Sequence, residues 1–211
     1  MSIVNSNLLL LSHPFYRRWE CGKLADGELA RYAEQYRHFE QKLPEFLKSL
    51  SAMMDAPGEA EARAFVDANL RDELGSSTSL SHAELFEQFA AAVKAGGPSV
   101  AATPATQRLL DVYQDAIISK DKAVALGVLA GYEVQAAEVA KTKGESLSKH
   151  YGLNANGTEF WDVHSDLEKE HADWTMSAAK GVDSEGFAEG VRRSSVAWYQ
   201  FMDEREAMAT F

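Results

Sequence analysis

A helical period of apolar residues runs through most of this chain, and its clearest stretch is residues 26–54. Apolar side chains recur there at helical spacing, at Leu29, Tyr32, Ala33, Tyr36, Phe39, Leu43, Phe46, Leu47 and Leu50. Residues three and four apart share one face of an α-helix, so this pattern predicts a long amphipathic helix. Because alternating β-branched residues are scarce and there are only 5 prolines, we expect an all-α protein.

Local start and stop signals divide the 211 residues into about seven to eight helices. The expected ranges are 14–22, 26–54, 59–74, 81–95, 105–118, 120–151, 158–180 and 184–211. We expect Asp26 to cap the second helix, Pro44 to kink it, and Gly144 to be a candidate break in the sixth. The connections are short, which favours an antiparallel, bundle-like single domain over residues 1–211.

The composition of the chain limits its possible binding partners and indicates a cellular compartment. A net charge of −11 argues against nucleic acid and anionic membrane surfaces as partners. Cys21 is the only cysteine, so an internal disulfide or a zinc–cysteine cluster is excluded and a reducing cytoplasm fits. The leucines at 8–11 have no basic leader and form no long apolar run, so we expect neither a signal peptide nor a membrane span.

His164, Glu168 and His171 form the pattern with the clearest chemistry. They stand at positions i, i+4 and i+7, so on a helix their side chains fall within about 60° of one another. Two imidazoles and a carboxylate on one helical face make half of a transition-metal site. Taken alone, the same residues also fit ordinary helix histidines and an exposed acid in a run of charge.

Three more candidate ligands lie on other expected helices. Glu73 and His82 flank the loop between two helices, and Glu133 interrupts an apolar stretch over residues 123–137. A carboxylate buried in such a stretch needs a partner, and a metal cation is an attractive one. Asp72 and Glu73 are neighbouring acids, so composition alone does not decide which of them is the ligand. His82 also fits an ordinary residue of a first helical turn.

The six groups together are three carboxylates and three imidazoles, a set that suits iron or manganese. Cores of helix bundles are where carboxylate–histidine sites for two cations are built. Six protein ligands leave coordination positions open for dioxygen or a substrate. The sequence therefore predicts an oxygen-handling metalloenzyme with two transition-metal ions, either two irons or manganese with iron.

This arrangement resembles the heme-oxygenase-like dimetal oxidases, which share their fold with the TenA thiaminases and the cofactor-less PQQ synthase PqqC. Those enzymes carry a carboxylate–histidine pair, an isolated glutamate in a core helix, and a helix with the motif H-x3-D/E-x2-H. The matching residues here are Glu73 with His82, Glu133, and His164 with Glu168 and His171. Glu168 departs from the commoner aspartate. The resemblance implies a heme-oxygenase-like helical bundle.

Within that family the chain is most similar to the CADD-type 4-aminobenzoate synthases. The segments that carry this likeness are 13–24, 29–36 and 43–47. Those enzymes consume themselves: the ring of one of their own tyrosines becomes 4-aminobenzoate, a folate precursor, and a lysine supplies the nitrogen. By position the resemblance implies that Tyr16 is the consumed tyrosine and Lys143 the amino donor, with Tyr132 as a radical relay or hydrogen-bond partner. Dioxygen and an external reductant are implied with them.

Tyr16 and Lys143 also have plainer interpretations, as a packing tyrosine and as a solvated lysine beside Lys141. Lys143 follows Glu133 by ten residues, which on a straight helix places it about 15 Å and about 80° away. It therefore reaches the metal site only if the helix bends or ends near Gly144, or if the pocket is long. A lysine drawn into such a pocket has a depressed pKa and a nucleophilic amine.

Other functions stay open on the sequence. A dimetal oxygenase acting on an external fatty acid, amino acid or amine needs an apolar tunnel, for which residues 101–118 and 124–130 are candidates. A metal-free TenA- or PqqC-like enzyme is a weaker alternative, because Cys21 does not lie where TenA places its nucleophile. An interaction protein has no support, since no exposed apolar motif is evident. The resemblance implies a homodimer. Core packing is the better explanation of the large apolar residues on the last helix, but they are also candidate contributors to a dimer: Trp198, Tyr199, Phe201 and Met202.

Overall fold

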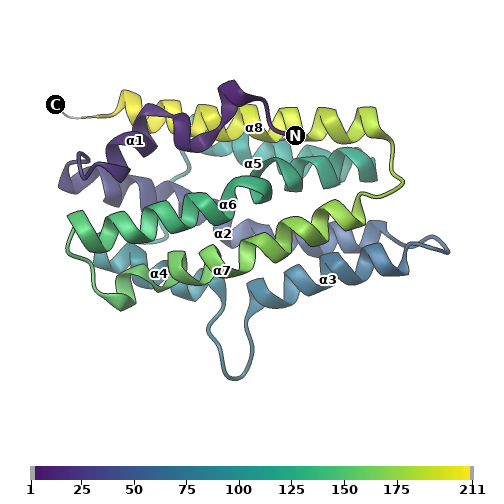
Figure 1. Cartoon of the computed structure of the whole chain (residues 1–211), viewed down its shortest axis with the longest axis horizontal. Coiled ribbons are helices and arrows are strands. Elements are labelled where there is room, and N and C mark those ends of the chain that lie inside the picture. Colours follow the sequence, from purple (N-terminus) through teal and green to yellow (C-terminus); the bar gives the residue numbers. More distant parts are fainter. Residues whose placement is uncertain (1–2, 210–211) are drawn as a thin grey trace.

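The computed structural model describes residues 3–209 of the chain. In this part of the chain, two short 3-10 helices, Ser6–Leu8 and Leu10–Ser12, precede eight α-helices. The α-helices are α1 (Pro14–Glu20), α2 (Asp26–Met53), α3 (Ala60–Leu74), α4 (His82–Ala92), α5 (Pro104–Ile118), α6 (Lys122–His150), α7 (Ala155–Ala178) and α8 (Ser184–Ala207) (Figure 1). The expected all-α bundle is confirmed.

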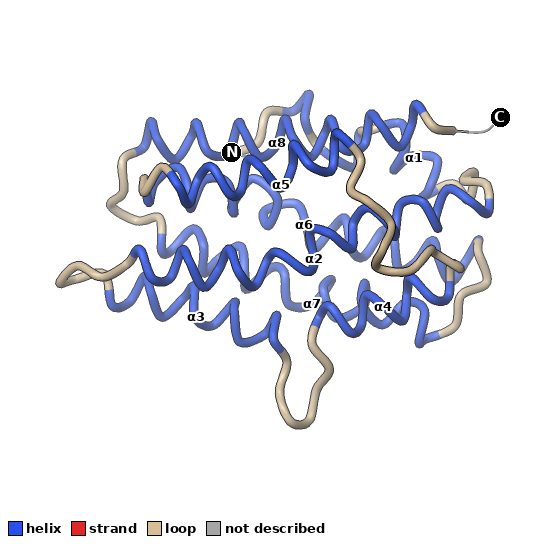
Figure 2. The backbone as a smooth tube through the Cα atoms, turned by 180° about the vertical axis from the view of Figure 1, so that it is seen from behind, coloured by secondary structure: helices blue, strands red, loops and turns tan. Residues whose placement is uncertain are grey.

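The long helices lie roughly side by side along the long axis of the molecule. In Figure 1 α6 crosses the centre, with α8 above it and α7 below it, and Figure 2 shows α2 from the opposite side. The loop between α3 and α4 protrudes from the bundle in both views. Because α6 packs against both α7 and α8, and α2 against α3 and α4, residues far apart in the sequence share one interior.

Helix α6 is the core of the bundle, because every residue from Ala123 to Glu133 is buried. By length and composition the helix is apolar enough to cross a membrane, but 78% of its apolar window is buried inside this fold. The apolar run around Glu133 is therefore explained by the helices that pack on all its sides.

Two expected helix boundaries were wrong. Helix α6 runs through Gly144 without a break; a Cβ there would lie 3.0 Å from Asp162 Oδ1 and 3.3 Å from Trp161 Cβ, so the glycine allows α7 to approach closely. The N-cap of α2 is Ala25, not Asp26, and the Glu28 carboxylate accepts a hydrogen bond from the Ala25 N–H at 2.7 Å. Helix α2 continues through Pro44 to its end.

The apolar residues of the last helix belong to the core. Trp198, Phe201 and Met202 are 0% exposed, so they cannot serve as a surface toward a second copy of the chain. Their helical spacing on α8 reflects packing against α6. Core packing, the interpretation that the sequence favoured, is thus confirmed for these three residues.

Two glycines let α6 and α8 cross with their backbones in contact. A Cβ on Gly127 would lie 2.1 Å from the Phe187 carbonyl oxygen, and a Cβ on Gly190 would lie 2.2 Å from the Val124 carbonyl oxygen. Backbone atoms in a packed core cannot retreat as a flexible side chain can. Any side chain at this crossing must therefore push the two helices apart.

We expect Gly190→Ala to destabilise the protein by about 3 kcal/mol, the upper end of typical overpacking costs. For a chain of this size the melting temperature should fall by about 6–12 °C. Gly97→Ala is the matched control, because a Cβ on Gly97 meets nothing within 4 Å. Thermal unfolding of both variants checks this, and equal melting temperatures would contradict the tight crossing.

Candidate metal centre

The six predicted metal ligands converge from four helices. Glu73 lies near the end of α3, His82 begins α4, Glu133 is in the middle of α6, and the remaining three are on α7. Each of the six is at most 5% exposed. The structure therefore brings all six into the interior of the bundle, where a bound cation would be shielded from water.

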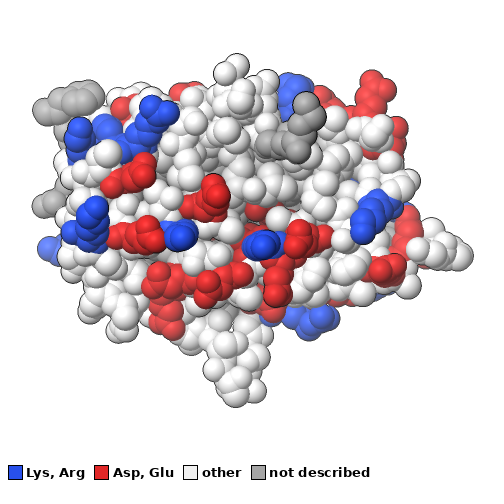
Figure 3. Space-filling view, in the orientation of Figure 1, with Lys and Arg blue, Asp and Glu red and all other residues white. Residues whose placement is uncertain are grey.

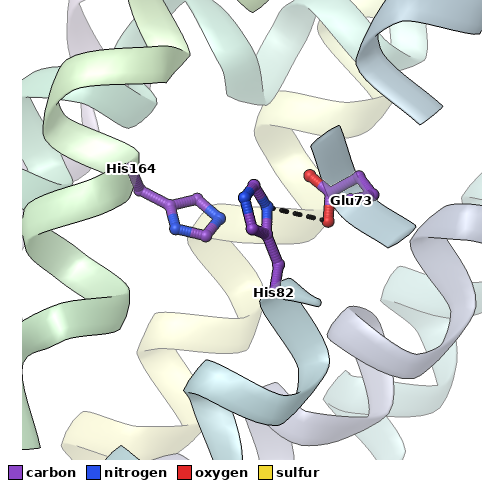
Figure 4. A group of neighbouring side chains, drawn as sticks. All are labelled: Glu73, His82 and His164. Carbon is purple, nitrogen blue, oxygen red and sulfur yellow. Dashed lines mark ion pairs between the residues drawn. The ribbon is translucent and has the colours of Figure 1, made fainter. Parts of the chain in front are cut away.

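Three of these groups already have the spacing of ligands to one cation. The ligand atoms of Glu73, His82 and His164 all lie within 4.8 Å of one another. Figure 4 shows the His82 ring between His164 and Glu73, with its Nδ1 3.1 Å from Glu73 Oε2. Ligands that bind one metal at about 2.1 Å and at right angles stand about 3 Å apart. That separation fits two neighbouring ligands.

The α7 motif turns one face inward, as its spacing predicted. Glu168 Oε1 lies 3.9 Å from His164 Nε2, and Glu168 Oε2 lies 3.8 Å from His171 Nδ1. The nearby acids Asp166 and Glu170 are exposed. Figure 3 shows acidic side chains gathered in a band across the face of the molecule on which α7 lies in Figure 1. The interpretation of Glu168 as one more solvated acid is therefore wrong.

Hydrogen bonds to neighbouring groups orient two of the predicted ligands, His164 and His171. The His164 Nδ1 donates to the Phe160 carbonyl at 2.7 Å, which leaves Nε2 facing Glu168. The His171 Nε2 lies 3.2 Å from Asp72 Oδ2, which leaves Nδ1 facing Glu168. Such partners set the tautomer and direction of metal-binding imidazoles. Asp72 thus supports a ligand, and its neighbour Glu73 is the buried group inside the site.

The chemistry of the donor set fits a transition-metal ion. Glu133 Oε2, Glu168 Oε2 and His82 Nδ1 are buried and have no hydrogen-bond partner. Burial raises the pKa of Glu133 to about 8 and that of Glu168 well above its usual range, while it lowers the pKa of His164. No lysine or arginine within residues 3–209 forms an ion pair with Glu133 or Glu168. A cation is the partner that these oxygens lack, and mixed carboxylate and imidazole donors suit iron or manganese.

Tyr16 and Lys143 meet in a second buried cluster. Tyr16 is 2% exposed and Lys143 is 1% exposed, which excludes the solvated-lysine interpretation. The Lys143 Nζ donates to the Tyr32 hydroxyl at 2.7 Å, and the Tyr32 and Tyr16 hydroxyls are 3.3 Å apart. The same Nζ lies 4.5 Å from the centre of the Tyr16 ring. Lys143 reaches this cluster from an unbroken α6 and does not line the metal cavity itself.

The Lys143 amine is held in conditions that favour its neutral form. Burial lowers the pKa of Lys143 well below its usual range, and the Glu40 carboxylate raises it by less. Aromatic faces attract a cation, but the surrounding rings of Tyr16 and Trp161 give no formal counter-charge. A neutral amine keeps the lone pair that a nucleophile needs.

Three functional candidates on α2 escaped the sequence analysis. Tyr32 joins Lys143 to Tyr16, Tyr36 hydrogen-bonds through its hydroxyl to the Tyr132 hydroxyl at 2.7 Å, and Glu40 lines the same cavity as Glu73. They follow one another at four-residue spacing on the apolar face of the helix. The sequence does contain one signal for Glu40: its carboxylate stands at a position where the helical period predicts an apolar residue.

Residues 30–199 match a protein family described as iron-containing redox enzymes. The chain is 30% identical to the 4-aminobenzoate synthase of Nitrosomonas europaea, over 96% of this chain and 87% of the relative. Its fold matches a CADD-like protein of Nostoc punctiforme with a TM-score of 0.79 and 18% identity, over 96% of this chain and 90% of the other. A Shewanella denitrificans domain with a heme oxygenase-like fold matches with a TM-score of 0.77 and 16% identity, over 95% of this chain and 87% of the other. With these likenesses and a buried carboxylate–histidine site, the chain belongs to the iron-containing redox enzymes of the heme-oxygenase-like fold.

Proposed function

We propose that this protein is a self-sacrificing 4-aminobenzoate synthase that consumes Tyr16, takes nitrogen from Lys143 and uses two bound transition-metal ions. The observation that carries the proposal is the buried contact of Lys143 with both tyrosines, 2.7 Å from the Tyr32 hydroxyl and 4.5 Å from the Tyr16 ring centre. A lysine sealed among aromatic rings without a salt bridge has no structural purpose that a methionine would not serve better. The 30% identical synthase of Nitrosomonas europaea supports the same activity.

The carbon skeleton of the product is already present in a tyrosine side chain. A tyrosine ring carries Cβ para to its hydroxyl, and 4-aminobenzoate carries a carboxyl carbon para to its amine. Breaking the Cα–Cβ bond, oxidising Cβ to the carboxyl with dioxygen as the oxidant, and breaking the Lys143 Cε–Nζ bond would complete the conversion, with the freed nitrogen taking the place of the ring oxygen, which leaves as water. Bound metal ions would supply the activation of dioxygen, with electrons from an external reductant.

The residues of the chain would position the reactants and exclude water. A run of aromatic contacts joins the metal cavity to Tyr16: the Tyr132 and Tyr36 hydroxyls are 2.7 Å apart, and the Tyr36 and Tyr32 rings stack at 5.4 Å. The Tyr32 hydroxyl then lies 3.3 Å from that of Tyr16. This run would give an electron and a proton a path between the two clusters, with Tyr132 at its metal end.

Peptide mass spectrometry tests the proposal directly. Protein reconstituted with iron and manganese and exposed to dioxygen is digested with trypsin, which separates Tyr16 and Tyr32 onto peptides 1–17 and 32–37. We expect loss of the Tyr16 side chain from peptide 1–17, in equal amount to the 4-aminobenzoate formed, and no loss without dioxygen. Product formed while both peptides stay intact would reject self-sacrifice. Loss confined to peptide 32–37 would move the consumed ring to Tyr32 or Tyr36, which share that peptide.

A second candidate function is oxygenation of an external small molecule. Helices α2 and α5 enclose a pocket of about 510 Å³, and Phe39, Leu43 and Tyr113 line both this pocket and the metal cavity. Residues of the expected stretch 101–118 line the pocket, whereas those of 124–130 do not. A substrate seated there would be separated from the ligands by a single layer of side chains. Removing the Tyr16 hydroxyl distinguishes the two functions, because only the self-sacrificing reaction requires it.

A further inference from the structure

Glu40 is a buried carboxylate that the six-ligand motif leaves out. It lies on α2, is 2% exposed, and lines one small cavity together with Glu73, Glu133 and Glu168. That cavity therefore receives carboxylates from four helices instead of three. A glutamate is among the residue types least often buried without a partner, so its place here needs an explanation.

The Glu40 carboxylate has no ion-pair partner within 4.0 Å in residues 3–209. Glu40 forms no ion pair there, and its Oε2 is buried without a hydrogen-bond partner. The Tyr36 hydroxyl, one helical turn earlier, interacts with the group. One phenol is a weak substitute for water around an ionised carboxylate. Glu40 thus resembles Glu133 and Glu168. Each lines the cavity and has a buried carboxylate oxygen without a hydrogen-bond partner.

The position of Glu40 is between the metal ligands and the buried lysine. On one side it lines a cavity with Glu73 and Glu168, and on the other the Tyr36 ring, one helical turn earlier, lies 5.1 Å from the Lys143 Nζ. The phenol pair of Tyr36 and Tyr132 lines the same cavity. A ligand at this point would bind the side of the metal centre that faces the Tyr16 cluster.

We propose that Glu40 is a seventh protein ligand, a fourth carboxylate that binds the metal centre on its Lys143 side. This inference rests on the proposed function insofar as it assumes two bound ions. Charge balance supports it: two divalent cations with three carboxylates and three neutral imidazoles keep a net positive charge in a buried site, and a fourth carboxylate cancels it.

Manganese(II) binding to the metal-free protein tests the inference without use of activity. Manganese is titrated into wild type, Glu40→Gln and Glu45→Gln, with bound metal measured by equilibrium dialysis and by electron paramagnetic resonance. Glu45 is an exposed carboxylate on the same helix, so Glu45→Gln controls for the loss of one charge. We expect wild type and Glu45→Gln to bind two ions, and Glu40→Gln to bind one of them at least about tenfold more weakly.

The outcomes separate this inference from the proposed function. If wild type binds two ions and Glu40→Gln binds both with unchanged affinity and spectrum, Glu40 is not a ligand and the proposed function stands. If wild type binds fewer than two ions, both ideas fail together. Metal-free Glu40→Gln should melt no lower than metal-free wild type, because the change removes an unpaired carboxylate. Glu40→Asp, which keeps the charge but shortens its reach, should bind manganese with intermediate affinity; wild-type affinity in both variants would overturn the inference.

Discussion

Lys143→Met is expected to abolish 4-aminobenzoate formation while leaving the bound metal unchanged. Methionine fills a similar volume and suits the surrounding aromatic rings, but it has no nitrogen to give. None of the six expected ligands contacts the lysine amine, which donates instead to the Tyr32 hydroxyl. The measurement is product yield per chain together with metal content. In wild-type protein made with nitrogen-15 lysine, the product should carry the label.

Lys141→Met is the matched control. Lys141 lies two residues earlier on α6 and is exposed, so its loss removes the same charge and chain length from the surface. We expect normal product yield from it. Equal product yields from Lys143→Met and Lys141→Met would show that the nitrogen does not come from Lys143. The contact of Lys143 with the two tyrosines would then no longer support the proposed function.

The same substitution predicts a change in stability that depends on pH. Burial lowers the pKa of Lys143 well below its usual value of 10.5. Between the folded and unfolded pKa values, the unfolded chain therefore binds a proton that the folded chain does not. The free energy of unfolding of wild type therefore falls as pH falls from about 10.5 toward the lowered value. Lys143→Met lacks this loss, so its advantage over wild type should grow toward neutral pH. Urea unfolding of the metal-free proteins at several pH values measures it, and a constant difference would mean that the folded amine is charged.

Helix periodicity predicted the parts of this molecule that depend on one helix alone. The α7 motif faces inward because residues spaced by four and three share a face whatever packs against them. Helix α5 begins at Pro104 as expected, since proline is suited to a first helical position. The buried position of Glu133 followed from the apolar residues on both sides of it in the sequence.

The remaining features depend on contacts between distant segments. Asp72 and Glu73 are neighbours of similar chemistry, and only the packing of α3 against α7 decides that Asp72 bonds to His171 while Glu73 is buried. Gly144 suggested a break in α6, but the close approach of α7 explains it. Glu40 was missed because its carboxylate neighbours come from α3, α6 and α7, which no local pattern on α2 reveals.

Tyr16→Phe is expected to stop both product formation and modification of the chain. Phenylalanine keeps the ring and Cβ, but the ring carbon that must receive nitrogen no longer carries an oxygen that can leave. The substitution also removes the 3.3 Å contact with the Tyr32 hydroxyl. Because only one buried hydroxyl is lost, we expect a stability cost of about 1 kcal/mol, too small to unfold the protein. Metal content should be unchanged.

Two further variants serve as comparisons for Tyr16→Phe. Tyr151→Phe removes a hydroxyl that bonds to the Leu24 N–H and the Trp19 carbonyl, so it controls for the loss of a structural phenol and should keep full product yield. Tyr32→Phe keeps the Tyr16 ring but breaks the hydroxyl link to Lys143 at 2.7 Å, so product should form more slowly and still come from peptide 1–17. If Tyr16→Phe still oxidises an added small molecule, the Tyr16 hydroxyl is not required for the reaction. The pocket between α2 and α5 is then the expected substrate site.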